Sequence, residues 1–348
     1  MRKLGTILFV IGTFALQLCF SQTPVQQHGQ LKVQGNLILD QHGNPVQLRG
    51  MSFFWSQWMG QYYNKNCVKW LVDDWKVSIV RAAMGAKHDE SQSGYMYDGS
   101  EQYKVRAVVD AAIKEGIYVI IDWHDHHAEE NAKAAQSFFE NMARRYGKHP
   151  NVIYEIYNEP LKVSWSSVVK PYAEQIVSAI RAIDPDNLII VGTPSWCQNV
   201  NEAADDPLQG ENIVYGLHFY AATHGADIRD KAQYALDKGI PLFVSEFGTC
   251  LASGDGFLDS AETEVWFSFM DKYKLSWCNW SVADKDETAS ALVPGGRWFG
   301  KWKQKDLTTS GRIIRRKLRQ YAGIIDKEEP VAEKKKEKKS WLQLKPVR

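Results

Sequence analysis

Outside its first 21 residues, the 348-residue chain has no long hydrophobic run. A membrane-spanning helix needs roughly 20 consecutive apolar residues, and no later segment supplies them. The sequence therefore predicts no membrane span in the mature chain. It also has no internal repeat of fixed period, which argues against a repeat architecture.

Cysteine is scarce, and its spacing argues against a zinc site. After Cys19, the chain has only four further cysteines, with no close pair of the kind that binds metal. Cys278 lies in an apolar run and is typical of a core residue. One disulfide among Cys67, Cys197 and Cys250 remains open for an exported protein, without a choice of pairing.

A strong charge of either sign is also missing, since the formal net charge is +1. Basic residues gather at Arg2, Lys3 and in the lysine-rich stretch after Pro330, so the body between them is mildly acidic. This balance argues against nucleic acid as a partner. We expect residues 325–348 to form a solvated, disordered tail.

Residues 1–21 have the layout of a secretory signal peptide. Arg2 and Lys3 precede an apolar stretch that ends at the small residue Ser21. The predicted organisation is a signal peptide (1–21), one main domain (22–324) and the tail (325–348). We expect a secreted or periplasmic monomer that uses no cofactor and no metal.

Short β-rich runs alternate with amphipathic helical patterns through the body of the chain. Strands are predicted at 46–51, 78–81, 118–122, 152–157, 188–191, 214–218, 242–245 and 276–280. Helices are predicted at 103–115, 131–146, 167–183, 226–237, 263–273 and 311–321. Eight such units predict a (β/α)8 TIM barrel, with an N-terminal β-hairpin at 31–46 plugging one end.

Two glutamates follow apolar strands, in Asn158-Glu159-Pro160 and Ser245-Glu246-Phe247-Gly248. The active site of such a barrel lies at the carboxyl ends of its strands. Cleaving a glycosidic bond needs one carboxyl group that donates a proton and one carboxylate that attacks or stabilises the sugar. The pair therefore predicts glycoside hydrolysis. Arg81 would keep Glu246 ionised, and Glu159 would need a raised pKa.

Further polar and aromatic residues follow the predicted strands. They are Trp58, Arg81, His124, Asn158, Trp196, His218, Tyr220, Trp280, Lys285 and Glu287. A sugar ring is held by polar groups around its edge and by aromatic rings against its C–H face. We expect Trp58, Trp196 and Trp280 to provide such stacking faces.

These motifs resemble glycoside hydrolase family 5, in its cellulase branch. The resemblance covers residues 30–322, through Arg81-Ala82-Ala83-Met84, Asp122-Trp123-His124, Leu217-His218-Phe219-Tyr220 and Asn279-Trp280-Ser281 with Lys285. It implies a retaining endo-β-1,4-glucanase, with Glu159 as acid/base and Glu246 as nucleophile. Their carboxyl groups should then lie about 5 to 5.5 Å apart.

The resemblance also implies roles for the other residues. Asn158 would bind the sugar 2-hydroxyl and Tyr220 would hold Glu246, while Arg81, His124 and His218 would order the site. The glucose subsites would be lined by Trp58, Trp196, Trp280, Lys285 and Glu287.

Two positions depart from the pattern of that branch. Phe54 replaces a histidine, and Gly85 replaces a tyrosine that often follows Met84. Tyr95, in the next loop, is the residue that could supply the lost hydroxyl to the substrate.

Three other interpretations remain open. The run His124-Asp125-His126-His127, with His218 and Asp284, could bind a catalytic metal ion. A sugar-binding barrel without activity would keep the tryptophans but would not explain the glutamates. The same mechanism could also act on mannan, xylan or a mixed-linkage glucan.

Overall fold

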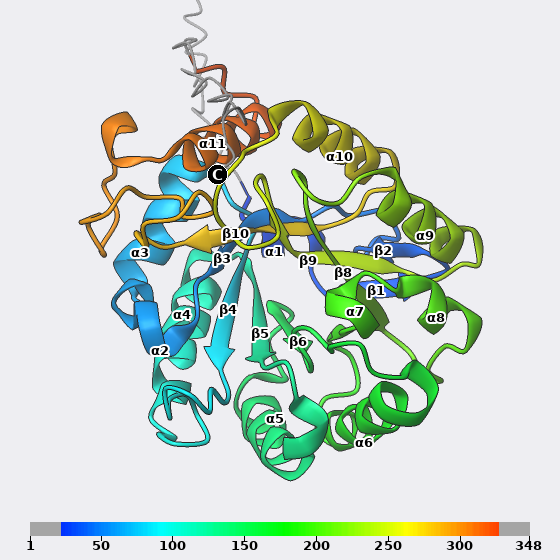
Figure 1. Ribbon diagram of the computed structural model, residues 1–348. Coiled ribbons are helices and arrows are strands. Elements are labelled where there is room, and N and C mark those ends of the chain that lie inside the picture. The colour runs from blue at the N-terminus through cyan, green and yellow to red at the C-terminus, as the bar shows by residue number, and fades with distance from the viewer. Residues whose placement is uncertain (1–21, 327–348) are drawn as a thin grey trace, which may run out of the picture.

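The computed structural model describes residues 22–326, in which eight parallel strands close into a barrel (Figure 1). In barrel order the strands are β10 (Trp277–Val282), β3 (Arg49–Phe53), β4 (Ile79–Gly85), β5 (Tyr118–His124), β6 (Val152–Glu155), β7 (Ile189–Val191), β8 (Ile213–Tyr220) and β9 (Leu242–Gly248). This confirms the predicted fold. The predicted signal peptide, and the tail from residue 327 onward, lie outside the described residues.

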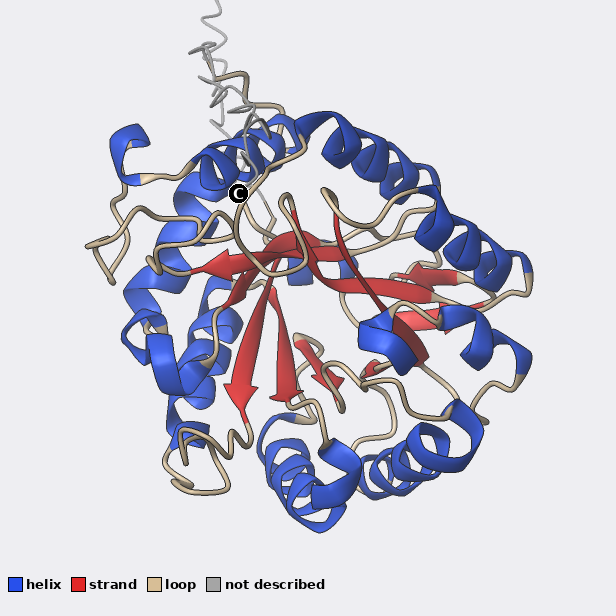
Figure 2. Cartoon of the chain, in the orientation of Figure 1, coloured by secondary structure: helices blue, strands red, loops and turns tan. Residues whose placement is uncertain are grey.

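Helices surround the barrel (Figure 2). The longer ones are α4 (Glu101–Glu115), α5 (Ala132–Tyr146), α6 (Lys170–Arg181), α9 (Ala226–Asp237), α10 (Ser260–Lys272) and α11 (Thr309–Tyr321). The short ones are α1 (Pro24–His28), α2 (Ser56–Met59), α3 (Lys65–Trp70), α7 (Pro194–Cys197) and α8 (Val200–Asp205). All six predicted helices are present. Across residues 22–326, no helix combines the length and apolarity needed to cross a bilayer.

A two-stranded antiparallel hairpin, β1 (Lys32–Gln34) with β2 (Leu37–Leu39), precedes the barrel. Leu31 and Ile38 from this segment join the buried cluster that contains Tyr118 and Ile120 of β5. The hairpin therefore closes the amino-terminal end of the barrel, as predicted.

Alternation along β5 explains why the opposite end is polar. Tyr118 and Ile120 belong to the interior cluster, whereas Val119 and Ile121 pack in the outer cluster of strands and helices. The inward series continues with Asp122 and then His124 at the end of the strand, because side chains alternate between the two faces. The barrel interior thus changes from apolar to charged toward its carboxyl end.

Strand β9 interrupts this alternation with a bulge. Phe243 pairs with Gly216 and Glu246 with His218, so β9 has one residue more than β8 over the same length. A bulge re-aims the side chains that follow it. As a result, Ser245 and Glu246 both make hydrogen bonds inside the barrel although they are consecutive in sequence.

The four cysteines of the described part are all free and buried. Cys278 lies in the interior cluster, as predicted. Cys67, Cys197 and Cys250 form no disulfide, so the pairing that the sequence left open is not made.

Candidate active site

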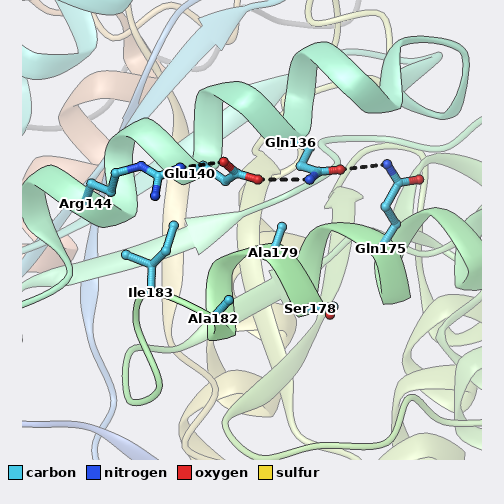
Figure 3. A pocket seen from close by; sticks show the side chains of 8 residues that line it. All are labelled: Gln136, Glu140, Arg144, Gln175, Ser178, Ala179, Ala182 and Ile183. Atoms are coloured by element: carbon cyan, nitrogen blue, oxygen red, sulfur yellow. Dashed lines mark hydrogen bonds and ion pairs between the residues drawn. The ribbon is translucent and has the colours of Figure 1, made fainter.

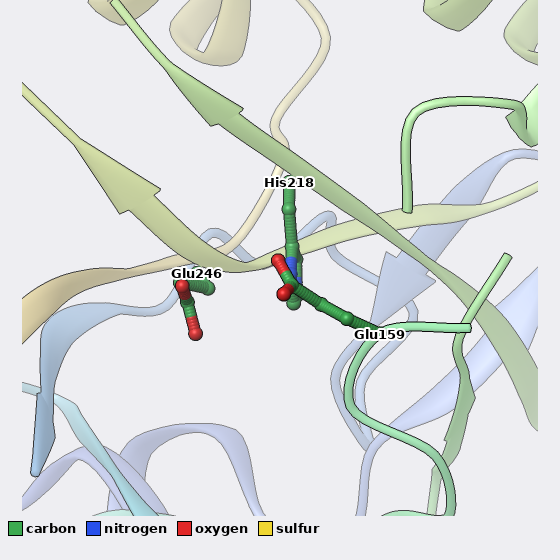
Figure 4. Close-up of side chains that lie close together, drawn as sticks. All are labelled: Glu159, His218 and Glu246. Carbon is green, nitrogen blue, oxygen red and sulfur yellow. The ribbon is translucent and has the colours of Figure 1, made fainter. Parts of the chain in front are cut away.

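Glu159 and Glu246 face each other at the carboxyl end of the barrel (Figure 4). Glu159 follows β6 and Glu246 lies within β9, beyond the bulge. A carboxylate oxygen of each glutamate and a ring nitrogen of His218 all lie within 4.8 Å of one another. This separation is short for the insertion of a water between two carboxyl groups and fits direct attack by one of them.

Arg81, fully buried on β4, is the centre of the charge network. Its Nη1 donates to Glu246 Oε2 at 2.9 Å and its Nε donates to Glu155 Oε2 at 2.6 Å. Its Nη2 lies 2.9 Å from Asp122 Oδ2. One guanidinium thus compensates three buried carboxylates, because its five donors point in several directions.

Glu246 has a second donor in Tyr220, whose hydroxyl lies 2.8 Å from Oε1. Each carboxylate oxygen of Glu246 therefore accepts one hydrogen bond, from Arg81 or from Tyr220. These contacts fix the direction of the carboxylate and favour its charged form.

Two histidines hold Glu159. His218 Nδ1 lies 2.9 Å from Oε1, and His126 Nε2 lies 3.2 Å from Oε2. Burial lowers the pKa of His218, but its contacts with Glu155 and Glu159 outweigh burial and raise the pKa to about 9. Burial lowers the pKa of His126 too, but its hydrogen bond to Glu159 and the charges of Glu159, Glu246 and Asp125 together raise it.

The two glutamates titrate in the order opposite to the one predicted from the sequence. Burial raises the pKa of Glu159, yet the hydrogen bonds from His126 and His218 hold it well below its usual range. Burial and the neighbouring charge of Glu159 raise the pKa of Glu246 in spite of Arg81. The carboxylate form of Glu159 and the protonated forms of His126 and His218 thus stabilise one another.

Aromatic rings form one wall beside this pair. Trp280 stacks on His124 with ring centroids 5.2 Å apart and also packs against Phe54 at 5.1 Å. His124 Nδ1 lies 2.7 Å from Asp122 Oδ2, within hydrogen-bond distance. Phe54 thus extends the apolar wall that Trp280 begins.

Trp58 and the Lys285–Glu287 pair lie beside Phe54. The Trp58 ring is 41% exposed and its centroid is 6.3 Å from that of Phe54. Lys285 Nζ lies 5.4 Å from the Phe54 ring and 2.5 Å from Glu287 Oε2. These predicted subsite residues are therefore brought together around Phe54.

Trp196 is held near the loop that carries Glu159 by a left-handed turn. Ser195, Trp196 and Cys197 all have positive φ angles, of 59°, 55° and 58°. Trp196 N donates to Pro160 O at 2.9 Å, which ties the turn to the loop that carries Glu159. Three strained residues in a row are typical of a functional segment, and here they present a partly exposed ring.

Tyr95 is not brought to the site. Its partly buried ring packs against Trp123 and Phe138 at centroid distances of 5.7 and 5.4 Å, at the margin of the core between strands and helices. The role of Tyr95 as a hydroxyl donor to the substrate stays a prediction that these ring contacts do not support. The space beside Gly85 is filled by the Gln57 side chain, since a Cβ at position 85 would lie 1.7 Å from Gln57 Oε1.

The predicted metal-binding alternative is not assembled. Within the described residues, the group spaced to hold a metal ion is Glu159, His218 and Glu246, not the histidine run. Asp284, another proposed ligand, accepts a hydrogen bond from Gly295 N.

A groove of about 560 Å³ between α5 and α6 lies apart from the glutamates (Figure 3). Arg144 and Gln136 both donate to Glu140, and Gln175 donates to Gln136. Because these groups satisfy one another, the chain of hydrogen bonds links the two helices and does not form a second catalytic site.

Sequence reasoning missed Glu155 and Trp55, named Asp122 only within a motif and considered His126 only as a metal ligand. The Trp55 ring contacts His124 and His126 at centroid distances of 4.2 and 5.7 Å. Glu155 accepts from Ser245 at 2.5 Å as well as from Arg81. Its signal was available, since a charged residue within an apolar strand that is buried on both faces needs a partner.

Comparisons with known proteins agree with this geometry. The family model for Cellulase, glycosyl hydrolase family 5, matches residues 39–286. Endoglucanase A of Evansella cellulosilytica is 47% identical over 335 residues, which cover 93% of this chain and 68% of that protein. Endoglucanase Z of Dickeya dadantii is 50% identical over 307 residues, covering 87% and 69%.

Solved structures are also similar. A structure from Cytophaga hutchinsonii has 54% sequence identity and a TM-score of 0.85, covering 87% of this chain and 98% of that one. The catalytic domain of Thermobifida fusca endoglucanase Cel5A has 35% identity and a TM-score of 0.81, covering 86% and 100%.

Proposed function

Because the chain belongs to glycosyl hydrolase family 5, we propose that it is a secreted, retaining endo-β-1,4-glucanase. It hydrolyses internal β-1,4-glucosidic bonds of a glucan through a covalent glycosyl-enzyme intermediate. The observation that carries the proposal is the short separation of Glu159 and Glu246, within 4.8 Å at the closest oxygens.

In the first step, an oxygen of Glu246 attacks the anomeric carbon while Glu159 gives a proton to the departing glycosidic oxygen. Arg81 and Tyr220 favour the charged carboxylate of Glu246 and aim it. In the second step, Glu159 takes a proton from water, and the water oxygen replaces Glu246 at the anomeric carbon. The new hydroxyl then has the original configuration.

Glucan is preferred as the substrate because the curated relatives are named endoglucanases. The aromatic wall of Trp280 and Phe54, with Trp58 beyond it, suits successive flat sugar rings. Mannan, xylan and mixed-linkage glucan share the linkage geometry and serve as comparison substrates.

The test is reducing-sugar release from carboxymethylcellulose, with mannan and xylan alongside. Glu159→Ala and Glu246→Ala should both lose glucan hydrolysis while keeping the wild-type circular dichroism spectrum. An early fall in viscosity marks internal cleavage, and proton NMR of the first product reports its configuration. Activity that survives Glu246→Ala, or an inverted product, contradicts the proposal.

Export is tested separately. The full chain should be released by a secreting host with an amino terminus near Gln22. Retention of residues 1–21 in the mature protein contradicts the secretory part of the proposal.

A further inference from the structure

The loop after β5 places His126 against the acid/base carboxylate. His126 Nε2 lies 3.2 Å from Glu159 Oε2, while His218 takes the other oxygen. The loops are joined by the backbone, since Asn158 N donates to Trp123 O and Glu159 N donates to Asp125 O. Both oxygens of Glu159 therefore accept hydrogen bonds from imidazole rings.

A general acid must turn a protonated oxygen toward the leaving group, so one of these contacts has to give way. His218 is poorly suited to move, because its side chain is 2% exposed and its Nε2 is bonded to Ser245 at 2.9 Å. Ser245 in turn donates a hydrogen bond to Glu155, and this chain of hydrogen bonds holds the His218 ring in place.

His126 is held much less. Its side chain is 36% exposed, and in residues 22–326 its ring makes a hydrogen bond only to Glu159. The backbone is fixed, because Tyr157 donates its hydroxyl to His126 O at 3.0 Å. The ring can therefore turn about its side-chain bonds without movement of the loop.

We propose that His126 is a proton relay for Glu159: it delivers its Nε2 proton to Glu159 Oε2 and is replaced there by the glycosidic oxygen. This rests on the proposed hydrolase function. The imidazolium of His126 loses one proton and becomes neutral, and the carboxylate of Glu159 gains it and becomes the acid. After the second step Glu159 again carries a proton, which returns to His126 when product leaves.

The charges around His126 favour this role. Carboxylates face it from three segments, namely Asp125 on its own loop, Glu159 after β6 and Glu246 on β9, and they stabilise its cationic form. A charged His124 would destabilise the cationic form of His126. Burial and, after it, the charge of Arg81 lower the pKa of His124, so His124 stays neutral. Binding of the sugar removes water and separates His126 from Glu159. The cationic form of His126 is thereby destabilised, which favours transfer of its proton to Glu159.

The experiment compares wild type with His126→Gln, whose amide can still donate to Glu159 but cannot carry the proton. Two substrates are used, a cellotetraose with an ordinary sugar leaving group and a 2,4-dinitrophenyl β-cellobioside, whose leaving group needs no proton. For cellotetraose we expect kcat/KM to fall about 10-fold or more, with the basic limb of the pH profile moving to lower pH. For the dinitrophenyl substrate, the formation of the glycosyl-enzyme should stay within about twofold.

His127→Gln is the matched control. His127 is the next residue, has a half-exposed side chain and pairs with Glu130 at 3.9 Å, so this variant should behave as wild type. If His126→Gln and wild type have superimposable pH profiles on cellotetraose, the relay is wrong although the hydrolase stands. If wild type cleaves neither substrate, the proposed function itself fails.

A second readout avoids substitution. Imidazole nitrogen NMR of wild type should show His126 losing its Nε2 proton when a thio-linked cellotetraose, which is not cleaved, is bound. A His126 that stays cationic in that complex overturns the relay.

Discussion

Arg81 Nη2 lies 2.5 Å from Asn158 Oδ1, and Asn158 Nδ2 has no hydrogen-bond partner among residues 22–326. The guanidinium offers only donors, so it fixes which end of the amide faces it. The Nδ2 group is consequently oriented in advance, and its cost of burial is recovered when a ligand oxygen accepts from it.

Asn158→Ala should therefore lower kcat/KM on cellotetraose by about 100-fold, as expected for loss of a donor that acts in the transition state. A 2-deoxy cellobioside with an activated leaving group lacks the matching hydroxyl. On that substrate, wild type and Asn158→Ala should differ by less than about threefold. An equal loss on both substrates contradicts a contact with the 2-hydroxyl.

Arg81→Met should destabilise the fold by about 3–5 kcal/mol at pH 7, because it leaves three buried carboxylates uncompensated. Unpaired buried carboxylates have raised pKa values and become neutral in acid. The loss in the free energy of unfolding, measured with urea, should therefore be smaller at pH 4.5 than at pH 7. A loss that is equal or larger in acid is the contrary result.

His218 should make stability depend on pH in the alkaline direction. Its pKa of about 9 in the folded protein lies above the ordinary value of 6.5. The contribution of protonated His218 to the stability of the fold is fully present below pH 6.5 and is lost as pH rises through 9. Urea unfolding of wild type and His218→Gln should show a difference that shrinks between pH 6.5 and 9. A difference that stays constant contradicts the linkage.

Trp58→Ala should raise KM for long cello-oligosaccharides about 3- to 10-fold and leave kcat nearly unchanged, since stacking on an exposed ring is uniform binding. Tyr103→Ala is the control, because Tyr103 is an exposed aromatic residue on α4, where its ring lies near Arg106. A similar rise in KM for both variants argues against a subsite at Trp58.

Removal of metal should leave activity unchanged. In the described part of the chain, the histidine run after β5 serves separate partners, with His124 on Asp122 and His126 on Glu159. Wild type dialysed against EDTA should keep its rate on carboxymethylcellulose. Loss of the rate, with recovery on adding a divalent ion, contradicts this reading.

The sequence predicted the barrel well because its strands are apolar on both faces and its helices are amphipathic. It placed Glu159 and Glu246 correctly at one end. It ended β5 at Asp122 and β9 at Ser245, whereas these strands continue to His124 and Gly248. These polar residues were interpreted as strand ends because their hydrogen-bond partners lie on other strands, which the local sequence does not reveal.

The same dependence on contacts between distant segments explains why the surroundings of Tyr95 and His126 could not be predicted. The sequence around an aromatic residue in a loop does not separate a packing position from a substrate contact, and the partly buried Tyr95 ring packs against the core. His126 has a histidine on its C-terminal side and another two residues before it, which suggested metal binding, while its contact to Glu159 depends on how two loops lie together.

The bulge in β9 has a consequence for how such enzymes can vary. A regular strand would send one of Ser245 and Glu246 outward, so the nucleophile and the residue that links His218 to Glu155 could not share a face. Deleting one residue between Phe243 and Glu246 would make the pairing with β8 regular, so Glu246 could stay opposite His218 but Ser245 could no longer share its face. The extra residue thus determines which side chains of β9 point into the barrel. The chemistry therefore depends on the length of this strand as much as on the identity of its residues.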